Sequence, residues 1–257
     1  MSLHYDLRLK QLLPANNGDS EIVLNREFGK WEQYIDGRIR ESWTWQEMNQ
    51  YRALGQHKEF DRACNEHAKS HQGQINAHRV VVLVHPFYLF SGNMNYVEGP
   101  QEHQEATQYL MRLTAFLRAR PSPDVLGVVA LENLPHYAAI TSRLLEVGMV
   151  DRVVFTRDDS GYTQSPKDLN ILKGKTLFYG GLHNEGCVSE AIQEMQTANG
   201  GMFSGEKNEQ GIFVIKNLTL NVPSYIEGLA PRGIMVGKEV LPENRLVRLE
   251  DVVESAK

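Results

Sequence analysis

After residue 78 the chain alternates apolar runs with amphipathic segments. Near-continuous runs of β-branched residues predict buried strands, and segments whose apolar residues recur every three or four positions predict helices. The expected strands cover 79–84, 125–131, 150–156, 175–179 and 212–215, with an extension to 220 open and a short strand at 246–249. The expected helices cover 104–119, 135–147 and 188–197, with a final helical turn after the last strand. Apolar strands separated by helices predict a three-layer α/β/α fold around a mostly parallel sheet.

The first 78 residues have a different pattern. They are rich in charged residues, Gln, Asn and His, and their apolar positions predict short helices over 27–39, 44–54 and 58–70. All three tryptophans of the chain lie here: Trp31, Trp43 and Trp45. We therefore expect a helical N-terminal region at 1–78, followed by an α/β domain at 79–257 that ends in a loop-rich tail.

The composition narrows the classes of protein to which this chain can belong. An apolar fraction of 41% and a charged fraction of 23% are ordinary globular values, which argues against disorder. A net charge of −5 gives no sign of the positively charged surface that proteins use to bind nucleic acid. The longest apolar run, near 80–84, is far too short to span a membrane, and residues 1–10 contain no secretory signal. These features predict a cytoplasmic protein that binds neither nucleic acid nor membrane, with homo-oligomerisation open.

No cofactor or metal is expected from the motifs. Cys64 and Cys187 lie far apart, so they suggest neither a disulfide framework nor a zinc site. The glycine-containing turn at 180–186 could hold a phosphate at a helix start, but it lacks the P-loop and GxGxxG spacings. Those glycines can equally well serve a tight turn.

Polar residues follow the predicted strands where each one ends. The first strand ends at His85, the second at Glu132, the third at Arg157 and the fourth at Gly180, which leads to Cys187. Ligands of open parallel sheets bind outside the carboxyl ends of the strands. The fold rules therefore predict that these residues share one rim.

Cys187 is the first candidate on that rim. It directly precedes a predicted helix, and the N–H groups of a helix start favour the thiolate, so Cys187 could be a nucleophile. It could also be a small buried residue that packs the helix onto the sheet. Position alone favours the packing interpretation.

The other candidates have two interpretations each. His85 could be a general base, or a histidine hydrogen-bonded within its loop, and Glu132 could orient a base or be a solvated carboxylate. With His183, these two would make a two-histidine, one-carboxylate metal set only if three strand ends met at ligand distance. We instead place His183, Asn184 and Gly186 among the candidate ligand-binding residues of the turn.

Three segments follow one another along the chain: Val82 to Phe90, Arg157 with Ser160-Gly161-Tyr162, and Gly181 to Val188 with a Gly-x-x-x-x-x-Cys-Val pattern. Their order and spacing resemble those of the isochorismatase-like cysteine hydrolases over about residues 79–220. The resemblance implies a three-layer α/β fold and a nucleophilic cysteine at Cys187. The family has an acid/base aspartate where this chain has His85, and a lysine where this chain has Arg157.

Two functions remain open. The favoured one is a non-catalytic or degenerate isochorismatase-like scaffold, which binds a protein or small-molecule partner and uses the tryptophan-bearing N-terminal region for protein contacts. The alternative is a divergent cysteine hydrolase of a small amide, ester or imide. Cys187 would then attack, His85 would move the proton, Arg157 would favour the thiolate, and N–H groups near Gly186 would stabilise the oxyanion.

Overall fold

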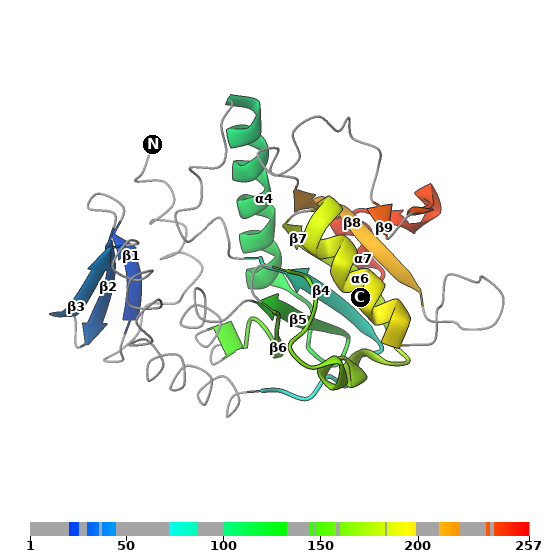
Figure 1. Ribbon diagram of the computed structural model, residues 1–257, viewed down its shortest axis with the longest axis horizontal. Helices are drawn as coiled ribbons and strands as arrows, with labels where there is room; N and C mark the ends of the chain where they lie inside the picture. The colour runs from blue at the N-terminus through cyan, green and yellow to red at the C-terminus, as the bar shows by residue number, and fades with distance from the viewer. Residues whose placement is uncertain are drawn as a thin grey trace.

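A six-stranded parallel sheet forms the centre of the protein (Figure 1). Its strand order is β11-β8-β7-β4-β5-β6. The computed structural model describes residues 21–25, 30–35, 38–44, 72–86, 100–132, 144–145, 148–157, 160–182, 184–198, 211–220, 235–236 and 239–256. The sheet strands are β4 Arg79–Val84, β5 Leu126–Glu132, β6 Arg152–Phe155, β7 Thr176–Leu182, β8 Ile212–Leu220 and β11 Leu246–Val247.

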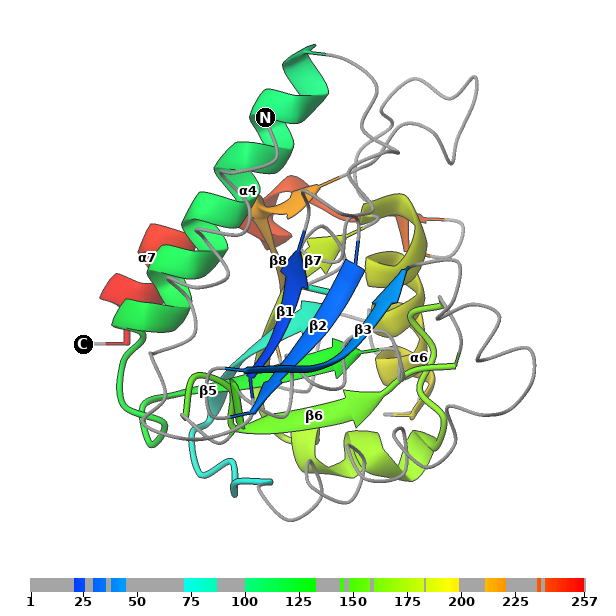
Figure 2. The same ribbon diagram turned by 90° about the vertical axis from the view of Figure 1, so that its left-hand side faces the viewer.

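Helices cover both faces of this sheet, and they are α4 Pro100–Ala119, η3 Pro166–Leu172, η4 Asn184–Val188, α6 Ser189–Ala198, η6 Glu243–Arg245 and α7 Leu249–Glu254. Helices α4 and α7 lie on one face and α6 on the other, as Figure 2 shows. The strands β9 Met235–Val236 and β10 Glu239–Val240 form a separate two-stranded antiparallel sheet. The predicted three-layer α/β/α fold with a parallel sheet is confirmed.

The strand order places a topological switch at the centre of the sheet. From β4 the chain first builds outward through β5 and β6, then returns to the other side of β4 and builds outward through β7, β8 and β11. The carboxyl ends of β4 and β7 are therefore neighbours from which connections leave in opposite directions. Ligands of doubly wound sheets bind at this position.

Two hydrophobic clusters explain why the strands are apolar throughout. Residues 81 and 83 of β4 pack in the cluster that contains α4, whereas residues 80, 82 and 84 pack in the cluster that contains α6. A strand buried on both faces cannot alternate apolar with polar residues. The predicted strand at 79–84 is confirmed at both ends, and the extension of the last long strand to 220 is also confirmed.

Several other boundaries move by a few residues. Helix α4 begins at Pro100 rather than at 104, and β7 continues through Leu182 rather than ending at 179. The expected strand at 246–249 is shortened to 246–247, because α7 begins at Leu249. Of the helix expected at 135–147, only residues 144–145 are described, and they are helical. Gly148 follows with a φ of 70°, which suits a glycine at a helix end.

The prediction of a helix over 27–39 is wrong. This stretch contributes to a three-stranded antiparallel sheet of β1 Glu21–Asn25, β2 Lys30–Ile35 and β3 Arg38–Thr44. Ile35 is paired with Arg38, and the two residues between them in the sequence are Asp-Gly, a preferred hairpin sequence. Beyond residue 44 the helix expected at 44–54 lies outside the described residues, as does the one at 58–70.

Residues 72–78 are bound to the sheet domain. The Gln72 side chain donates to the Val153 carbonyl (3.2 Å) and accepts from the Val153 N–H (2.9 Å), so it pairs with the edge strand β6 as a neighbouring strand would. Lys175 Nζ donates to the carbonyls of Ile75 (2.9 Å) and Ala77 (2.7 Å). The α/β domain therefore extends upstream of Arg79, where the apolar pattern begins.

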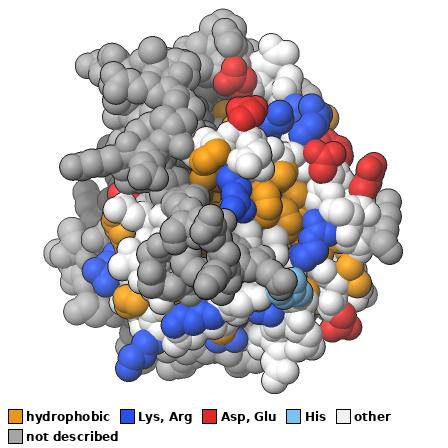
Figure 3. Space-filling model, turned by 90° about the vertical axis from the view of Figure 1, so that its right-hand side faces the viewer, with side chains coloured by type: hydrophobic (Ala, Val, Ile, Leu, Met, Phe, Trp, Pro, Cys, Tyr) orange, Lys and Arg blue, Asp and Glu red, His pale blue; other side chains and the backbone are white. Residues whose placement is uncertain are grey.

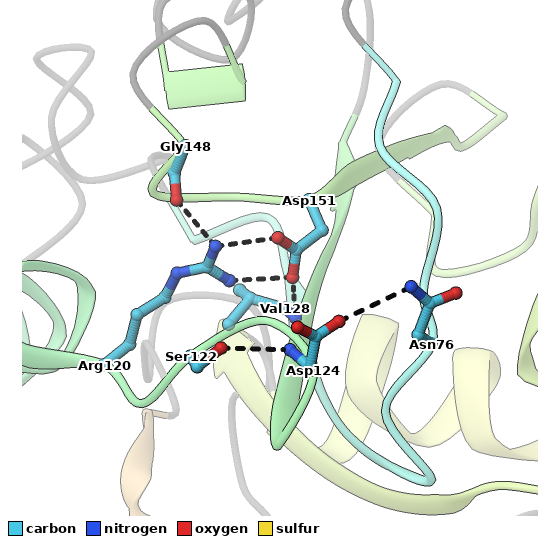
Figure 4. Close-up of polar contacts among 7 residues, drawn as sticks. All are labelled: Asn76, Arg120, Ser122, Asp124, Val128, Gly148 and Asp151. Atoms are coloured by element: carbon cyan, nitrogen blue, oxygen red, sulfur yellow. Dashed lines mark hydrogen bonds and ion pairs between the residues drawn. The ribbon is translucent and has the colours of Figure 1, made fainter.

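An ion pair fixes the start of β6 (Figure 4). The Arg120 guanidinium donates to both carboxylate oxygens of Asp151, each at 2.7 Å, and also to the Gly148 carbonyl at 2.6 Å. Asp151 in turn accepts the Val128 N–H at 2.7 Å. The pair thus joins the end of α4, the strand β5 and the start of β6.

Basic side chains lie directly beside hydrophobic ones on the face of the molecule shown in Figure 3. Two cation–π contacts are present among the described residues: the Arg79 guanidinium lies 5.0 Å from the Phe178 ring centroid, and the Arg245 guanidinium lies 5.2 Å from the Phe213 ring centroid. The two phenylalanine rings stack on each other with centroids 5.4 Å apart. Arg79 also donates to Ser255 at 2.7 Å, which attaches the end of the chain to β4.

Among the residues that the structure describes, no helix combines the length and apolar character needed to cross a membrane.

Candidate functional site

The ends of β4, β5, β6 and β7 meet on one rim, as the sequence predicts. Val84 is paired with Leu131 on one side and with Gly181 on the other, and Glu132 is paired with Phe155. The residues that follow these strands are therefore neighbours although they lie far apart in the sequence.

His85 leaves its strand in an unusual backbone conformation. Its φ is 43°, which is uncommon for a residue other than glycine, although histidine tolerates it better than most. Its N–H still donates to the Leu131 carbonyl at 2.8 Å, so the ladder between β4 and β5 continues by one residue. The His85 side chain is 3% exposed and its Nε2 lies 3.1 Å from Thr156 Oγ1. A buried hydroxyl at the end of β6 therefore fixes the direction of this imidazole.

Glu132 lies beside His85 and is fully buried. Tyr109 of α4 reaches the same region, where its hydroxyl donates to the Pro86 carbonyl at 3.3 Å. Burial raises the pKa of Tyr109 far above its usual range, and the charge of Glu132 raises it further. The Glu132 carboxyl group and the Tyr109 phenol are therefore both buried near the rim, and the charge of the first acts on the second.

The raised pKa of Tyr109 predicts a loss of stability in alkali. An unfolded tyrosine ionises near pH 10 and the folded one does not, so the folded protein holds more protons above that pH. Stability should be retained below pH 10 and should then fall by about 1.4 kcal/mol per pH unit from this residue. Urea unfolding of Tyr109→Phe between pH 9 and 11 should show a correspondingly shallower decline than the unmodified protein. Tyr162→Phe, at a partly exposed position, is the control, and parallel curves for all three proteins would contradict the prediction.

Cys187 lies at the start of α6 but not on an open surface. It belongs to the π-helical turn η4, in which Gly186 has the non-helical angles φ −112° and ψ −107°, and α6 begins two residues later at Ser189. Cys187 is 7% exposed and is part of the hydrophobic cluster with Val188 and Ala191. The local geometry is that of a helix start, and the environment is that of the core.

A short segment after β6 lies against Cys187. A Cβ added at Gly161 would overlap the Cys187 carbonyl, so only glycine permits this approach. The Gly161 N–H donates to Glu190 Oε2 at 2.7 Å and the Thr163 N–H donates to Glu194 Oε2 at 2.6 Å. Two carboxylates of α6 therefore join the segment to this helix, and its Thr163 also pairs with Thr156 at the end of β6.

Arg157 is anchored to the same segment. Its Nε donates to the Thr163 carbonyl at 2.8 Å, and its own N–H donates to the Tyr162 carbonyl at 2.7 Å. Arg157 as a whole is exposed to solvent. These contacts give Arg157 a role in the turn that follows β6.

The remaining candidates are only partly described. His183 lies outside the described residues, and for Asn184 the structure gives the backbone alone. Within the described ranges no group of three or more His, Cys, Asp or Glu residues is arranged to hold a metal ion. The set of His85, Glu132 and His183 stays untested, because one member is not described.

Several residues at the rim were absent from the sequence prediction: Tyr109, Thr156, Thr163, Glu190 and Glu194. The two glutamates are four residues apart in α6, so the helical spacing could have placed them on one face. Thr156 is separated from His85 by 71 positions, and only the parallel pairing of the strands could have joined them.

Comparison with known proteins adds no relative: no family model, no curated protein and no solved structure matches the chain.

Proposed function

We propose that this protein is a non-catalytic, degenerate isochorismatase-like α/β scaffold that binds a protein partner. The observation that carries the proposal is the burial of Cys187 in the hydrophobic cluster that α6 shares with the sheet. A nucleophile must be approached by its substrate, whereas a buried apolar cysteine packs a helix onto a sheet.

The positions of the two helper residues support the same proposal. His85 Nε2 is directed at Thr156 Oγ1, and Arg157 Nε at the Thr163 carbonyl. Each group therefore has a structural contact on the β6 side of the rim. Arginine in the place of the family's lysine would also remain protonated throughout a reaction cycle.

The N-terminal sheet is the part that we propose meets the partner. Trp31 is directly opposite Trp43 in the register of β2 and β3, and tryptophan is enriched among the residues that dominate binding energy. A three-stranded sheet of 18 described residues has little scope to bury a core of its own. We propose that a partner protein contacts this sheet at the Trp31–Trp43 pair.

Thiol chemistry tests the catalytic half of the proposal. In a Cys64→Ser background, Cys187 should react with 5,5′-dithiobis(2-nitrobenzoate) at least about tenfold more slowly than glutathione at pH 7.5, because it is buried. Hydrolysis of a panel of small esters, amides and imides should be the same for Cys187→Ala and for the background protein. Fast thiol modification with turnover lost in Cys187→Ala would overturn the proposal.

The alternative function, a divergent cysteine hydrolase, draws support from one feature. Cys187 lies two residues before α6 and after the carboxyl end of β7, beside the topological switch. Helix-start N–H groups would stabilise a thiolate there. The turnover assay above separates this alternative from the scaffold.

A further inference from the structure

We propose that the Gln72 side chain takes the place of a further strand at the outer edge of β6, and that it thereby keeps this edge from pairing with β6 of a second copy of the chain. In the parallel sheet β6 is the longer of the two edge strands, with four residues against two in β11. An open edge strand presents unpaired N–H and C=O groups to any other chain. The inference is independent of the proposed function.

The sequence of β6 gives this edge little protection of its own. Residues 153–156 read Val-Val-Phe-Thr, which combines high β-propensity with the absence of charge and proline. Arg152 is the one charged residue of the strand, and Asp151 before it is bound by Arg120. Proteins close such edges with charges, with proline or with a covering segment. A covering segment is therefore the protection to look for here.

The second half of the edge is covered by main chain. The Gln164 N–H donates to the Phe155 carbonyl at 2.8 Å, and the Arg157 N–H donates to the Tyr162 carbonyl at 2.7 Å. Residues 162–164 thus follow this part of the edge as an antiparallel neighbour. Substitution of a side chain leaves these backbone bonds available, so this half stays closed in most variants.

The first half of the edge depends on residues 72–73. The Gly73 N–H donates to the Asp151 carbonyl at 2.7 Å. Gln72 Nε2 donates to the Val153 carbonyl at 3.2 Å, and Gln72 Oε1 accepts the Val153 N–H at 2.9 Å. A carboxamide carries the same donor and acceptor as a peptide group, so one side chain satisfies both groups of Val153. Replacement of Gln72 removes both bonds together.

The chain beyond Gln72 has anchors of its own. Lys175 Nζ donates to two carbonyls within residues 75–77, and the Thr176 N–H donates to the His78 carbonyl at 2.9 Å. These bonds do not involve the Gln72 side chain. A substitution there should therefore open the edge locally and leave the fold intact.

The occupant that fits an opened edge is the same strand of a second copy. In an antiparallel pair, opposite residues exchange both N–H and C=O bonds, so Val153 of one copy can pair with Val153 of the other across a two-fold axis. The side chains of Val153 and Val154 are already buried in the two clusters of their own domain. The pairing would rest on main-chain hydrogen bonds, so it should be weak and should depend on concentration.

Amide hydrogen exchange at Val153, followed by nuclear magnetic resonance in the full-length protein, tests the proposal. Gln72→Leu keeps the bulk of the side chain and removes its polar groups. In dilute solution its Val153 amide should exchange at least about tenfold faster than in the unmodified protein. At about a hundredfold higher concentration the exchange should slow again, and sedimentation should show a larger species than the unmodified protein forms.

Gln164→Ala is the matched control, because it removes a glutamine side chain beside the same strand and keeps the N–H that binds Phe155. It should match the unmodified protein in both measurements. Val153 exchange within about twofold of the unmodified protein in Gln72→Leu overturns the proposal, and so does fast exchange that is the same at both concentrations. If Gln72→Leu does not fold, Gly73→Ala decides, with the same results expected, because its Cβ would lie 2.9 Å from the Asp151 carbonyl oxygen and lift the same segment from β6.

Discussion

Replacement of Asp151 by alanine should lower the free energy of unfolding by about 3–5 kcal/mol, the usual cost of breaking a buried ion pair from one side. The side chains of Arg120 and Asp151 are 8% and 9% exposed, so the arginine would keep its charge with little water to replace the carboxylate. The substitution also removes the acceptor of the Val128 N–H. Urea unfolding followed by circular dichroism measures the loss.

The chain contains a matched control for this pair. Arg248 and Glu250 form an ion pair at 3.3 Å, but their side chains are 59% and 54% exposed. Glu250→Ala should therefore change stability by less than about 1 kcal/mol. In a double-mutant cycle, Arg120→Ala should cost much less in the Asp151→Ala background than alone, because no carboxylate remains to be orphaned. Equal effects of Asp151→Ala and Glu250→Ala would contradict a special role for the buried pair.

Some elements could be predicted because their sequence is determined by burial alone. The strand β4 is a run of valine and leucine from 80 to 84, and every one of these residues is buried. Its apolar composition alone therefore identifies it as a buried strand. The N-terminal sheet shows the opposite case. Its strands mix charged with apolar residues, so apolar content alone does not identify them, and the sequence analysis did not use the Asp-Gly pair that favours a hairpin.

The candidate site also has one part that could be predicted and one part that could not. That His85, Glu132, Arg157 and Cys187 would lie at or beyond the carboxyl ends of strands could be predicted, because the apolar runs mark the strands and parallel strands share one carboxyl edge. The state of each group could not be predicted. Cys187 is buried in a hydrophobic cluster made by distant strands, and its carbonyl is approached by Gly161, which belongs to a segment bound by two glutamates of α6.

Replacement of Gly181 by alanine should destabilise the protein by about 3 kcal/mol or more, from overpacking and backbone strain together. Gly181 has a φ of 124°, a conformation that only glycine adopts readily, and an added Cβ would overlap the Val84 carbonyl in the neighbouring strand. Because Val84 immediately precedes His85, relief of the overlap must push β4 and β7 apart at the topological switch.

Gly174→Ala separates the two causes of that loss. Gly174 also has a positive φ, 75°, but nothing lies within 4 Å of an added Cβ, so its substitution carries the backbone strain without the overlap. It should cost only about 1–2 kcal/mol. Unfolding of both variants in urea gives the difference, which measures how closely the two central strands approach. If Gly181→Ala cost no more than Gly174→Ala, the strands would be able to separate without loss, and the rim at His85 would be far less rigid than its contacts with Leu131 and Thr156 indicate.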